Sequence, residues 1–287
     1  MRFAFIDGHK DEYPVGIMCR MLSVSRSGYY EWLGRDASQR KLDELRLVRK
    51  IEDVHRGSRS TYGSPRVTRM LKALGETASE GRVARIMQRY GIRAKQARKY
   101  RPQTTNSKHS LPVAPDRLQR DFTPPAENRA WVADITYIPT REGWLYLACV
   151  MDLFSRKIVG HSMHERMPQE LTMEALARAF ANRRPAAGLI SHSDRGSQYA
   201  SEAYRRLVAK HAAIQSMSRK GNCWDNAPME SFFHSLKGEH VSWHDYQTRA
   251  EAKQSIFEWI EVFYNRQRLH SAIGYMAPET YEAGFAA

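Results

Sequence analysis

The sequence predicts an α/β protein in which an all-helical region precedes a mixed sheet flanked by helices. Three observations predict this fold class. Residues 14–91 repeat apolar side chains at helical spacing. Three strand-like runs with short turns follow between residues 130 and 163, as in an antiparallel meander. Helical and strand-like segments then alternate to about residue 266, which is typical of a sheet covered by helices.

The N-terminal region, residues 1–57, is expected to be helical. Pro14 can begin a short helix, and a Ser/Gly turn separates it from a second short helix that runs to about residue 33. Residues 38–56 are predicted to form a longer charged helix with Leu45 and Ile51 on one side.

Residues 58–94 are predicted to form a DNA-binding helix-turn-helix. Ser64 is expected to cap the first helix and Gly75 to end it, while Ser79 is expected to cap the second helix. An ordinary helical hairpin with solvated arginines explains the same pattern. If the second helix reads DNA, its expected contacts are the arginines off its apolar stripe, Arg82, Arg85 and Arg89.

Positive charge is concentrated in the first part of the chain. Residues 1–125 carry 26 Lys and Arg against 13 Asp and Glu, a net charge of +13, whereas residues 126–287 carry 19 against 18, a net charge of +1. This asymmetry indicates a polyanionic partner, most simply nucleic acid, although a solvated basic surface has the same composition. Residues 95–125 lack periodicity and are predicted to be a basic linker, in which Lys99 can contact DNA phosphates.

The composition argues against a membrane-spanning or disulfide-stabilised protein. No apolar run reaches the ~18 residues that a membrane span needs, and the charged start of the chain is unlike a signal peptide. The three cysteines are odd in number and widely spaced. They fit neither a disulfide framework nor a zinc site, and they indicate a reducing cytosol.

Residues 126–287 are predicted to form one domain that carries three distinctive acidic residues. Asp134 lies inside the first strand and shares a face with Val132, since alternate residues of a strand face the same way. Asp194 directly follows a short strand, and Glu230 lies one turn into a helix. Carboxylates from three separate elements are the ligands that hard divalent cations prefer, so these three residues are the predicted metal ligands.

The spacing of 35 residues between Asp194 and Glu230 does not identify a site by itself. With 12 Asp and 19 Glu in the chain, the same spacing also separates two other pairs, Asp134/Glu170 and Asp225/Glu261. Only the pair Asp194/Glu230 combines a loop after a strand, a following helix and a further aspartate in an upstream strand. Asp225 is instead expected to cap a helix.

Five segments carry a resemblance to a known family. They are WVADITYI, MDLFSRKIVG, HSDRGSQY, GNCWDNAPMESFFHSLKGE and YNRQRLHSAIGYMAPETY. Over residues 14–287 the chain resembles the OrfB transposases of the insertion-sequence-three family, which are similar to retroviral integrases in their catalytic core. The resemblance implies an RNase H-like integrase core, that is, a mixed five-stranded sheet with flanking helices.

The resemblance also implies an activity and a set of partners. It implies a transposase that binds the terminal inverted repeats of an insertion sequence and cuts and joins DNA strands with two Mg²⁺ or Mn²⁺ ions. The family's catalytic acids correspond to Asp134, Asp194 and Glu230, and its basic residue seven positions later corresponds to Lys237. Expected partners are transposon ends and target DNA, with a homo-oligomer formed on DNA in the bacterial cytoplasm, at the nucleoid. Whether the chain acts alone or fused to the product of an upstream reading frame is open.

The expected roles of other residues near the acids are less specific. Arg195 and Gln198 follow the metal-binding aspartate and are expected to line the DNA channel. Trp224 is expected to pack in the core rather than to stack on a base, and Asp152 is expected to be structural. His234 is expected to pack near the site without binding metal.

Two other functions compete with the transposase. A non-catalytic DNA-binding regulator would use the helix-turn-helix and the basic half, but it leaves the three acids unexplained. A nuclease that cleaves RNA–DNA hybrids would use the acids, but it leaves the basic N-terminal region unexplained.

Overall fold

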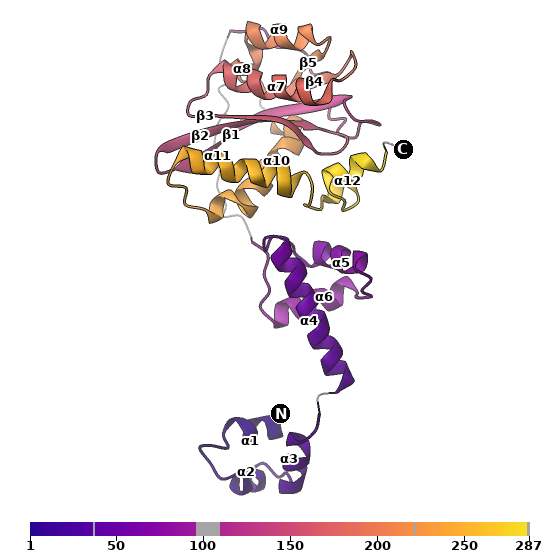
Figure 1. The fold of residues 1–287 in the computed structure, drawn as a ribbon, viewed down its shortest axis with the longest axis vertical. Helices are drawn as coiled ribbons and strands as arrows, with labels where there is room; N and C mark the ends of the chain where they lie inside the picture. The colour runs from indigo at the N-terminus through magenta and orange to yellow at the C-terminus, as the bar shows by residue number, and fades with distance from the viewer. Residues whose placement is uncertain (37, 96–109, 221, 286–287) are drawn as a thin grey trace. The chain divides into compact units, whose positions relative to one another are not determined.

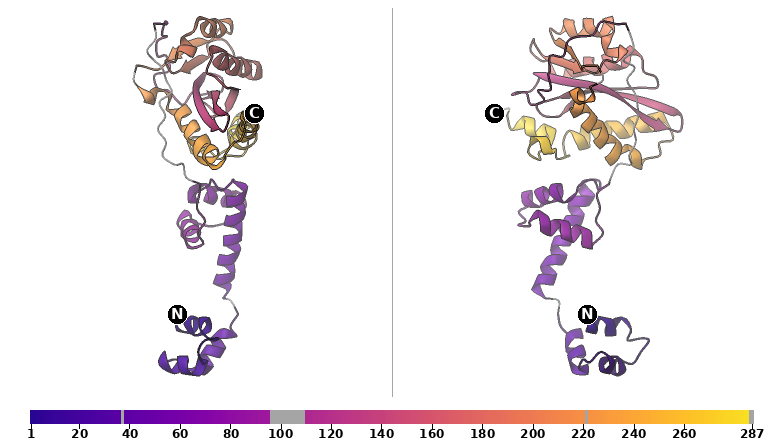
Figure 2. Two further views of the ribbon diagram at one scale, coloured as in Figure 1. Left: turned by 90° about the vertical axis from the view of Figure 1, so that its left-hand side faces the viewer. Right: turned by 180° about the vertical axis from the view of Figure 1, so that it is seen from behind.

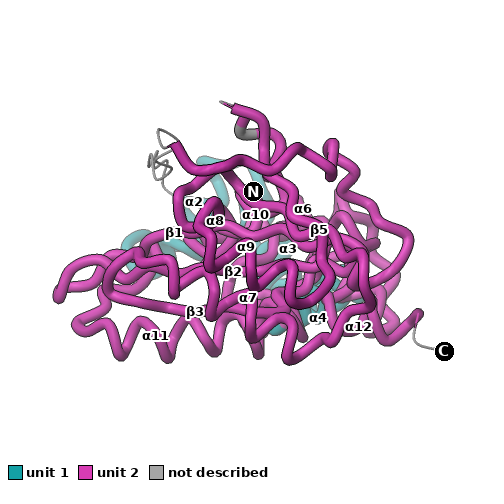
Figure 3. The backbone as a smooth tube through the Cα atoms, turned by 90° about the horizontal axis from the view of Figure 1, so that it is seen from above, with its two compact units in different colours: residues 1–53 teal, residues 54–287 magenta. Residues whose placement is uncertain are grey.

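The computed structural model describes residues 1–36, 38–95, 110–220 and 222–285. They fall into two units, Met1–Asp53 and Val54–Ala287, which Figure 3 shows in different colours. The boundary lies inside helix α4 (Gln39–Gly57). The helix-turn-helix region therefore shares a unit with the sheet, whereas the sequence suggested divisions at residues 57, 94 and 125. Lys99 lies outside the described residues.

Three short helices pack together in the first unit. They are α1 (Arg2–Gly8), α2 (Val15–Met21) and α3 (Arg26–Leu33). Their buried side chains Ile6, Met18 and Tyr29 form a small core, and the Tyr29 hydroxyl donates a 3.2 Å hydrogen bond to Asp7. The sequence predicted α2 and α3 but not α1, because the apolar residues of α1 are too few to show a periodicity. This helix is recognised only through its contacts with the other two helices.

The predicted helix pair is present as α5 (Ser64–Ala73) and α6 (Glu80–Arg89). Ser79 caps α6, since its side chain accepts a hydrogen bond from the backbone N–H of Arg82. The start of α5 differs by one residue from the prediction. Gly63 occupies the N-cap, and Ser64 is the first helical residue without making a capping bond.

The sheet has five strands, as the resemblance implied, in the order β3-β2-β1-β4-β5 (Figure 1). Strands β1, β2 and β3 form the predicted antiparallel meander, and β4 and β5 pair in parallel with β1 and with each other. The sheet is therefore mixed. The bounds of the strands are β1 Ala130–Thr140, β2 Gly143–Asp152, β3 Ile158–His164, β4 Ile190–Ser193 and β5 Ile214–Met217.

Helices cover both faces of the sheet (Figures 1 and 2). On one face lie α7 (Gln169–Arg183), α8 (Ser197–Ala200) and α9 (Glu202–Lys210); on the other lie α10 (Ala227–Glu239) and α11 (Arg249–Glu258). Along β1, Trp131 and Ala133 belong to the core against α7, whereas Val132 and Ile138 belong to the core against α10. Residue 134 has the parity of Val132, so it lies on the α10 side.

The last helices of the chain depart from the single helix expected over residues 248–266. Helix α11 ends at Glu258 and continues as a π-helical segment, η3 (Trp259–Tyr264), whose wider turn ends with a 2.9 Å bond from the N–H of Asn265 to the carbonyl of Ile260. A short helix, α12 (Pro278–Ala283), follows. Within the described residues, no helix is both long and apolar enough to cross a membrane.

The described end of the basic segment, residues 110–123, packs against the sheet. Leu118 is only 3% exposed and belongs to the core shared with α10. The backbone N–H groups of Arg117 and Leu118 donate to the side chain of Ser216 in β5, at 2.8 and 3.2 Å. This part of the predicted linker therefore forms part of the core. A charge pattern could not indicate that, since the contact partners lie about a hundred residues later.

Buried polar groups fix the ends of several elements. Asp152, at the end of β2, is fully buried and accepts hydrogen bonds from the backbone of Asn128 and Phe154 and from the Trp131 ring. Arg183 of α7 lies 3.6 Å from it. Asp152 is therefore structural, as expected.

A second buried network joins the helix-turn-helix region to the end of α10. Arg268 is 3% exposed and makes two 2.6 Å bonds to Glu239, the last residue of α10. Arg66 of α5 lies 3.8 Å from the same carboxylate. The hydroxyl of Tyr62 accepts a 2.7 Å bond from the N–H of Leu269. Arg66 is thus turned toward the core and is not a solvated arginine.

The contact between β3 and α7 predicts a sharp effect of one methyl group. A Cβ on Gly160 would overlap the carbonyl oxygen of Ala175 and would lie 2.7 Å from the backbone nitrogen of Ala179. We expect Gly160→Ala to lower the free energy of unfolding by about 1–3 kcal/mol, because the helix must move off the sheet. Urea unfolding measures this loss.

The matched control is Gly81→Ala, since Gly81 lies in α6 and its Cβ would meet open space. This substitution should raise stability by about 0.5–1 kcal/mol through helix propensity. Equal stability of the Gly160→Ala variant and the unaltered chain would contradict the close helix–sheet contact.

Candidate active site

The sheet register brings two of the predicted acids to neighbouring positions. Strands β1 and β4 run in parallel with Ala133 opposite Ser193. Asp134 follows Ala133 and Asp194 follows Ser193, so the two aspartates lie side by side at the end of this pairing. Asp134 faces the α10 side, and its side chain accepts a 2.8 Å bond from the N–H of Ile135. The pairing of the two strands, rather than any local pattern, places the two carboxylates together.

The loop after β4 holds Asp194 through a tight turn. The Oδ1 atom of Asp194 accepts a 2.9 Å bond from the N–H of Gly196. A Cβ on Gly196 would lie 3.0 Å from that same oxygen and 3.2 Å from the side-chain oxygen of Gln198. A glycine at this position lets the backbone approach the carboxylate closely.

Glu230 reaches the site from the first turn of α10. The start of this helix is tied to β1, because the side-chain amide of Asn226 donates a 3.2 Å bond to the carbonyl of Ala133. Asn226 occupies the N-cap, but its side chain makes no capping bond. It fastens the helix beside Asp134 instead.

Negative charge is crowded at this place. The pKa of Asp134 is raised well above its ordinary value by burial, then by the charge of Asp194, and further by that of Glu230. The N–H of Ile135 and the charge of Lys237 act in the opposite direction. Burial also raises the pKa of Glu230. The three predicted acids therefore lie close enough to repel one another.

The donor set fits a hard divalent cation, since it offers carboxylate oxygens alone and an excess of negative charge. The side chains are nevertheless not drawn together. Among the described residues, no three His, Cys, Asp or Glu side chains are gathered closely enough to hold an ion. A bound cation would have to bring the three carboxylates nearer to one another.

Lys237 lies beside the acids, two turns along α10 from Glu230. Its ammonium nitrogen is 4.6 Å from the centre of the Tyr137 ring on β1. Burial lowers the pKa of Lys237, while the charge of Asp134 raises it. The side chain of His234, between Glu230 and Lys237 in the helix, is exposed and does not pack as expected.

Asp225 has a different role from the expected helix cap. Its side chain is 1% exposed and accepts bonds from Arg219 through Nε at 3.0 Å, Nη2 at 2.8 Å and the backbone N–H at 2.9 Å. Arg120 adds a further bond of 2.8 Å from its Nε. These partners, with Arg219 first, hold the pKa of Asp225 far below its usual range. We call this group, Asp225 with Arg120 and Arg219, the arginine clamp.

Trp224 does not pack in the core, contrary to the sequence-based expectation. It is 68% exposed, in the short helix η1 (Cys223–Asn226) that precedes α10. The physical reason is that its neighbours Asp225 and Asn226 occupy the inward positions, with 1% and 5% exposure. Consecutive residues of so tight a turn cannot all face inward.

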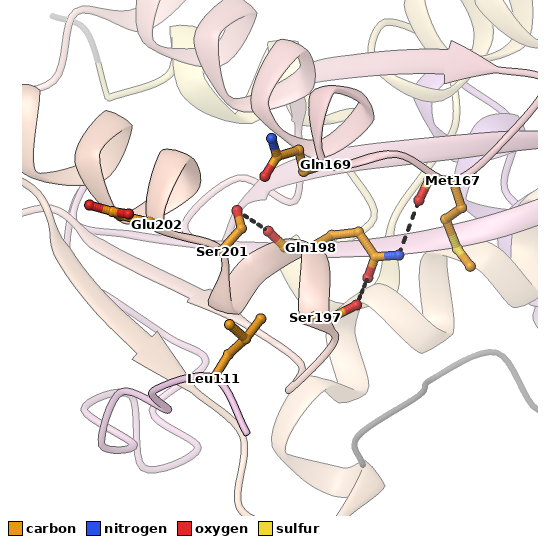
Figure 4. A pocket seen from close by; sticks show the side chains of 7 residues that line it. All are labelled: Leu111, Met167, Gln169, Ser197, Gln198, Ser201 and Glu202. Atoms are coloured by element: carbon orange, nitrogen blue, oxygen red, sulfur yellow. Dashed lines mark hydrogen bonds between the residues drawn. The ribbon is translucent and has the colours of Figure 1, made fainter. Parts of the chain in front are cut away.

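The predicted DNA contacts of the core make bonds within the protein. Arg195 donates a 2.6 Å bond from its Nε to the carbonyl of Ser218, next to β5. Gln198 donates to the carbonyl of Met167 at 3.2 Å and lines an open cavity of about 410 Å³ (Figure 4). On α6, the side chains of three arginines are exposed: Arg82, Arg85 and Arg89. They lie at helical spacing on one side of that helix.

One buried histidine near the site was missed by sequence reasoning. His192 of β4, two residues before Asp194, is fully buried between the hydroxyls of Ser216 and Ser218, at 2.8 and 3.2 Å. Burial lowers its pKa. It joins β4 to β5 immediately before the loop that carries Asp194. Its partners come from another strand, so no local signal could have identified this role.

A mixed five-stranded sheet with acids from β1, the end of β4 and α10 defines an integrase-type polynucleotidyl transferase core. The family of integrase core domains matches residues 124–223, and a second integrase core family matches residues 212–278. The HTH-like domain family matches residues 41–100.

The chain belongs to the IS3 family of transposases. It is 40% identical over 284 residues to transposase InsF for insertion sequence IS3A of Escherichia coli (strain K12), covering 98% of each chain. It is 48% identical over 264 residues to the insertion element IS600 uncharacterized 31 kDa protein of Shigella sonnei, covering 92% of this chain and 97% of that protein. Among solved structures it is similar to the HTLV-2 integrase catalytic core domain, at 13% identity and a TM-score of 0.43, covering 55% of this chain and 98% of that one.

The opposite environments of two aspartates predict opposite effects of the same substitution. Ionised Asp134 is disfavoured in the folded state, so its folded pKa is raised and its charge costs stability at pH 7. Asp134→Asn should therefore raise the melting temperature in EDTA. Asp225 is stabilised when ionised, and Asp225→Asn should lower stability by about 1–3 kcal/mol because bonds to charged partners are weakened.

Thermal melts of both variants at pH 7 in EDTA measure these two effects. Because the substitution is identical, each variant serves as the control for the other. A lower melting temperature for Asp134→Asn than for Asp225→Asn would contradict the assignment of repulsion to one site and clamping to the other.

Proposed function

We propose that this chain binds the terminal inverted repeats of an insertion sequence and catalyses DNA strand cleavage and strand transfer. The observation that carries the proposal is the convergence of Asp134, Asp194 and Glu230 from three elements onto one side of the sheet, with Lys237 beside them. Membership of the IS3 transposase family supports the same function.

The proposed chemistry is an in-line displacement at phosphorus, with water as the attacking group in cleavage and a 3′-hydroxyl in joining. Asp134, Asp194 and Glu230 would hold two divalent ions, Mg²⁺ or Mn²⁺, which when bound stabilise the attacking and leaving oxygens. The protein itself positions the strand and keeps the carboxylates in place. No covalent intermediate with the protein is needed.

Binding of the DNA is assigned to two regions. The exposed arginines of α6 present charge suited to a DNA groove or backbone, and Lys237 offers a cation next to the acids for a phosphate of the bound end. Arg195 and Gln198 would support the loop after Asp194 and line the channel, and Lys99 would contact the backbone. We also infer that the chain acts as a homo-oligomer on transposon ends and target DNA at the bacterial nucleoid, alone or joined to an upstream-frame protein.

The decisive test removes one negative charge at a time. Asp134→Asn, Asp194→Asn and Glu230→Gln should each reduce cleavage and joining by on the order of a thousandfold or more, because an amide is a poor ligand for a hard cation. The assay is nicking and strand transfer on a duplex of the element's terminal repeat with Mg²⁺, and a thermal melt shows that each variant is folded.

The control is Glu170→Gln, since Glu170 is exposed at the start of α7 and is separated from Asp134 by 35 residues. This variant should keep near-normal activity. Near-normal activity of Asp194→Asn or Glu230→Gln would show that the wrong pair had been chosen. A chain that binds the end but never cuts it would instead be the non-catalytic regulator, and cleavage of RNA–DNA hybrids alone would favour the nuclease.

Lys237 has its own test in the salt dependence of end binding. Removing one phosphate contact should weaken binding at all salt concentrations and reduce the slope of log affinity against log salt by about 1. We expect this for Lys237→Ala, while Lys253→Ala, on the exposed surface of α11, should leave the slope unchanged. Identical slopes for the two variants would place Lys237 among ordinary surface lysines.

A further inference from the structure

Trp224 presents a large apolar surface to solvent on a rigid support. The ring is 68% exposed, although an indole is among the side chains that gain most from burial. Both residues that follow it make hydrogen bonds through their side chains. Asp225 lies in the arginine clamp, and Asn226 is bonded to the carbonyl of Ala133 on β1. The tryptophan is therefore held in place without being covered.

The support fixes Trp224 next to the acids. Asn226 is bonded to the residue before Asp134, and Glu230 follows Trp224 by six residues, in the first turn of α10. On the other side, Arg120 donates a 2.8 Å bond to Asn222, two residues before Trp224. The backbone is thus tied down both before and after the ring, so a partner that contacts the ring binds with little loss of loop freedom.

The surroundings of the ring are cationic. The side chains of Arg120 and Arg219 are 42% and 54% exposed even though both hold Asp225, and Lys220 is exposed as well. An aromatic face bordered by positive charge is the arrangement that binds unpaired nucleic acid bases, with the ring against the base and the cations near the backbone.

We propose that Trp224 stacks on a nucleobase that leaves the helix stack beside the scissile phosphate of the bound transposon end. This inference rests on the proposed function, since it takes DNA cleavage at the three acids as given. Bases inside a duplex are covered by their neighbours, so a protein ring reaches a base face only after the base has unpaired. Stacking on Trp224 offsets part of the cost of this unpairing and keeps the distorted strand at the acids.

The first experiment compares two DNA ends with the full chain and Mg²⁺. One end is fully paired, and the other has mismatched bases at the scissile phosphate, so that the unpairing cost is already removed. Trp224→Ala should cut the paired end about tenfold to a hundredfold more slowly, the range for loss of one base–aromatic stack. On the mismatched end the deficit should shrink to about threefold or less.

Two variants serve as controls. Trp224→Phe keeps an aromatic face and should recover most of the cutting rate on the paired end. Phe257→Ala removes an aromatic of comparable exposure, 54%, from α11 and should cut both ends normally. An equal deficit of Trp224→Ala on both ends, or no deficit at all, overturns the proposal. So does a change in the oligomeric state of Trp224→Ala, because the ring would then be covered by protein.

A second measurement does not depend on cutting. In the Glu230→Gln background, 2-aminopurine at the unpaired position of the mismatched end should be quenched on binding when Trp224 is present and should stay bright with Trp224→Ala. Absence of cleavage by the unaltered chain would contradict the proposed function. The fluorescence would still show whether Trp224 stacks on the unpaired base. Equal fluorescence in the two backgrounds would defeat the stacking inference alone.

Discussion

The parallel pairing of β1 with β4 is the constraint on which the candidate site depends. Asp134 is half-buried, and burial together with the charges of two neighbouring acids raises its pKa, so a separation of these carboxylates would be favourable. The structure does not allow it, because the parallel pairing of Ala133 with Ser193 fixes Asp194 and the bond from Asn226 to the carbonyl of Ala133 fixes the helix of Glu230. Both restraints act through the residue adjacent to Asp134.

The charge of Asp225 is compensated by neighbouring arginines, whereas the charge at the proposed metal site is compensated much less. Asp225, just before α10, accepts hydrogen bonds from Arg120 and Arg219, which neutralise its charge inside the protein. Near Asp134, the charge of Lys237 lowers the pKa of that carboxyl. The same residue type therefore serves as an anchor in one place and is the proposed metal ligand in the other.

Local sequence patterns predicted the features that depend only on residues close together in the chain. The meander, the α6 cap at Ser79 and the alternation that turns Asp134 toward α10 follow from strand and helix periodicity, and all are present in the structure. The role of Asp225 could not be predicted, since its partner Arg120 lies 105 residues earlier. The exposure of Trp224 could not be predicted either, because tryptophan side chains are highly buried on average in folded proteins.

The packing of residues 110–123 has a practical consequence for anyone who shortens this chain. A catalytic fragment that begins at residue 126, the start of the domain predicted from the sequence, would lose Leu118 from the hydrophobic core and Arg120 from Asp225. Ser216 would also lose two donors. A minimal core intended for crystallisation or for fusion to another DNA-binding module should therefore begin near residue 110.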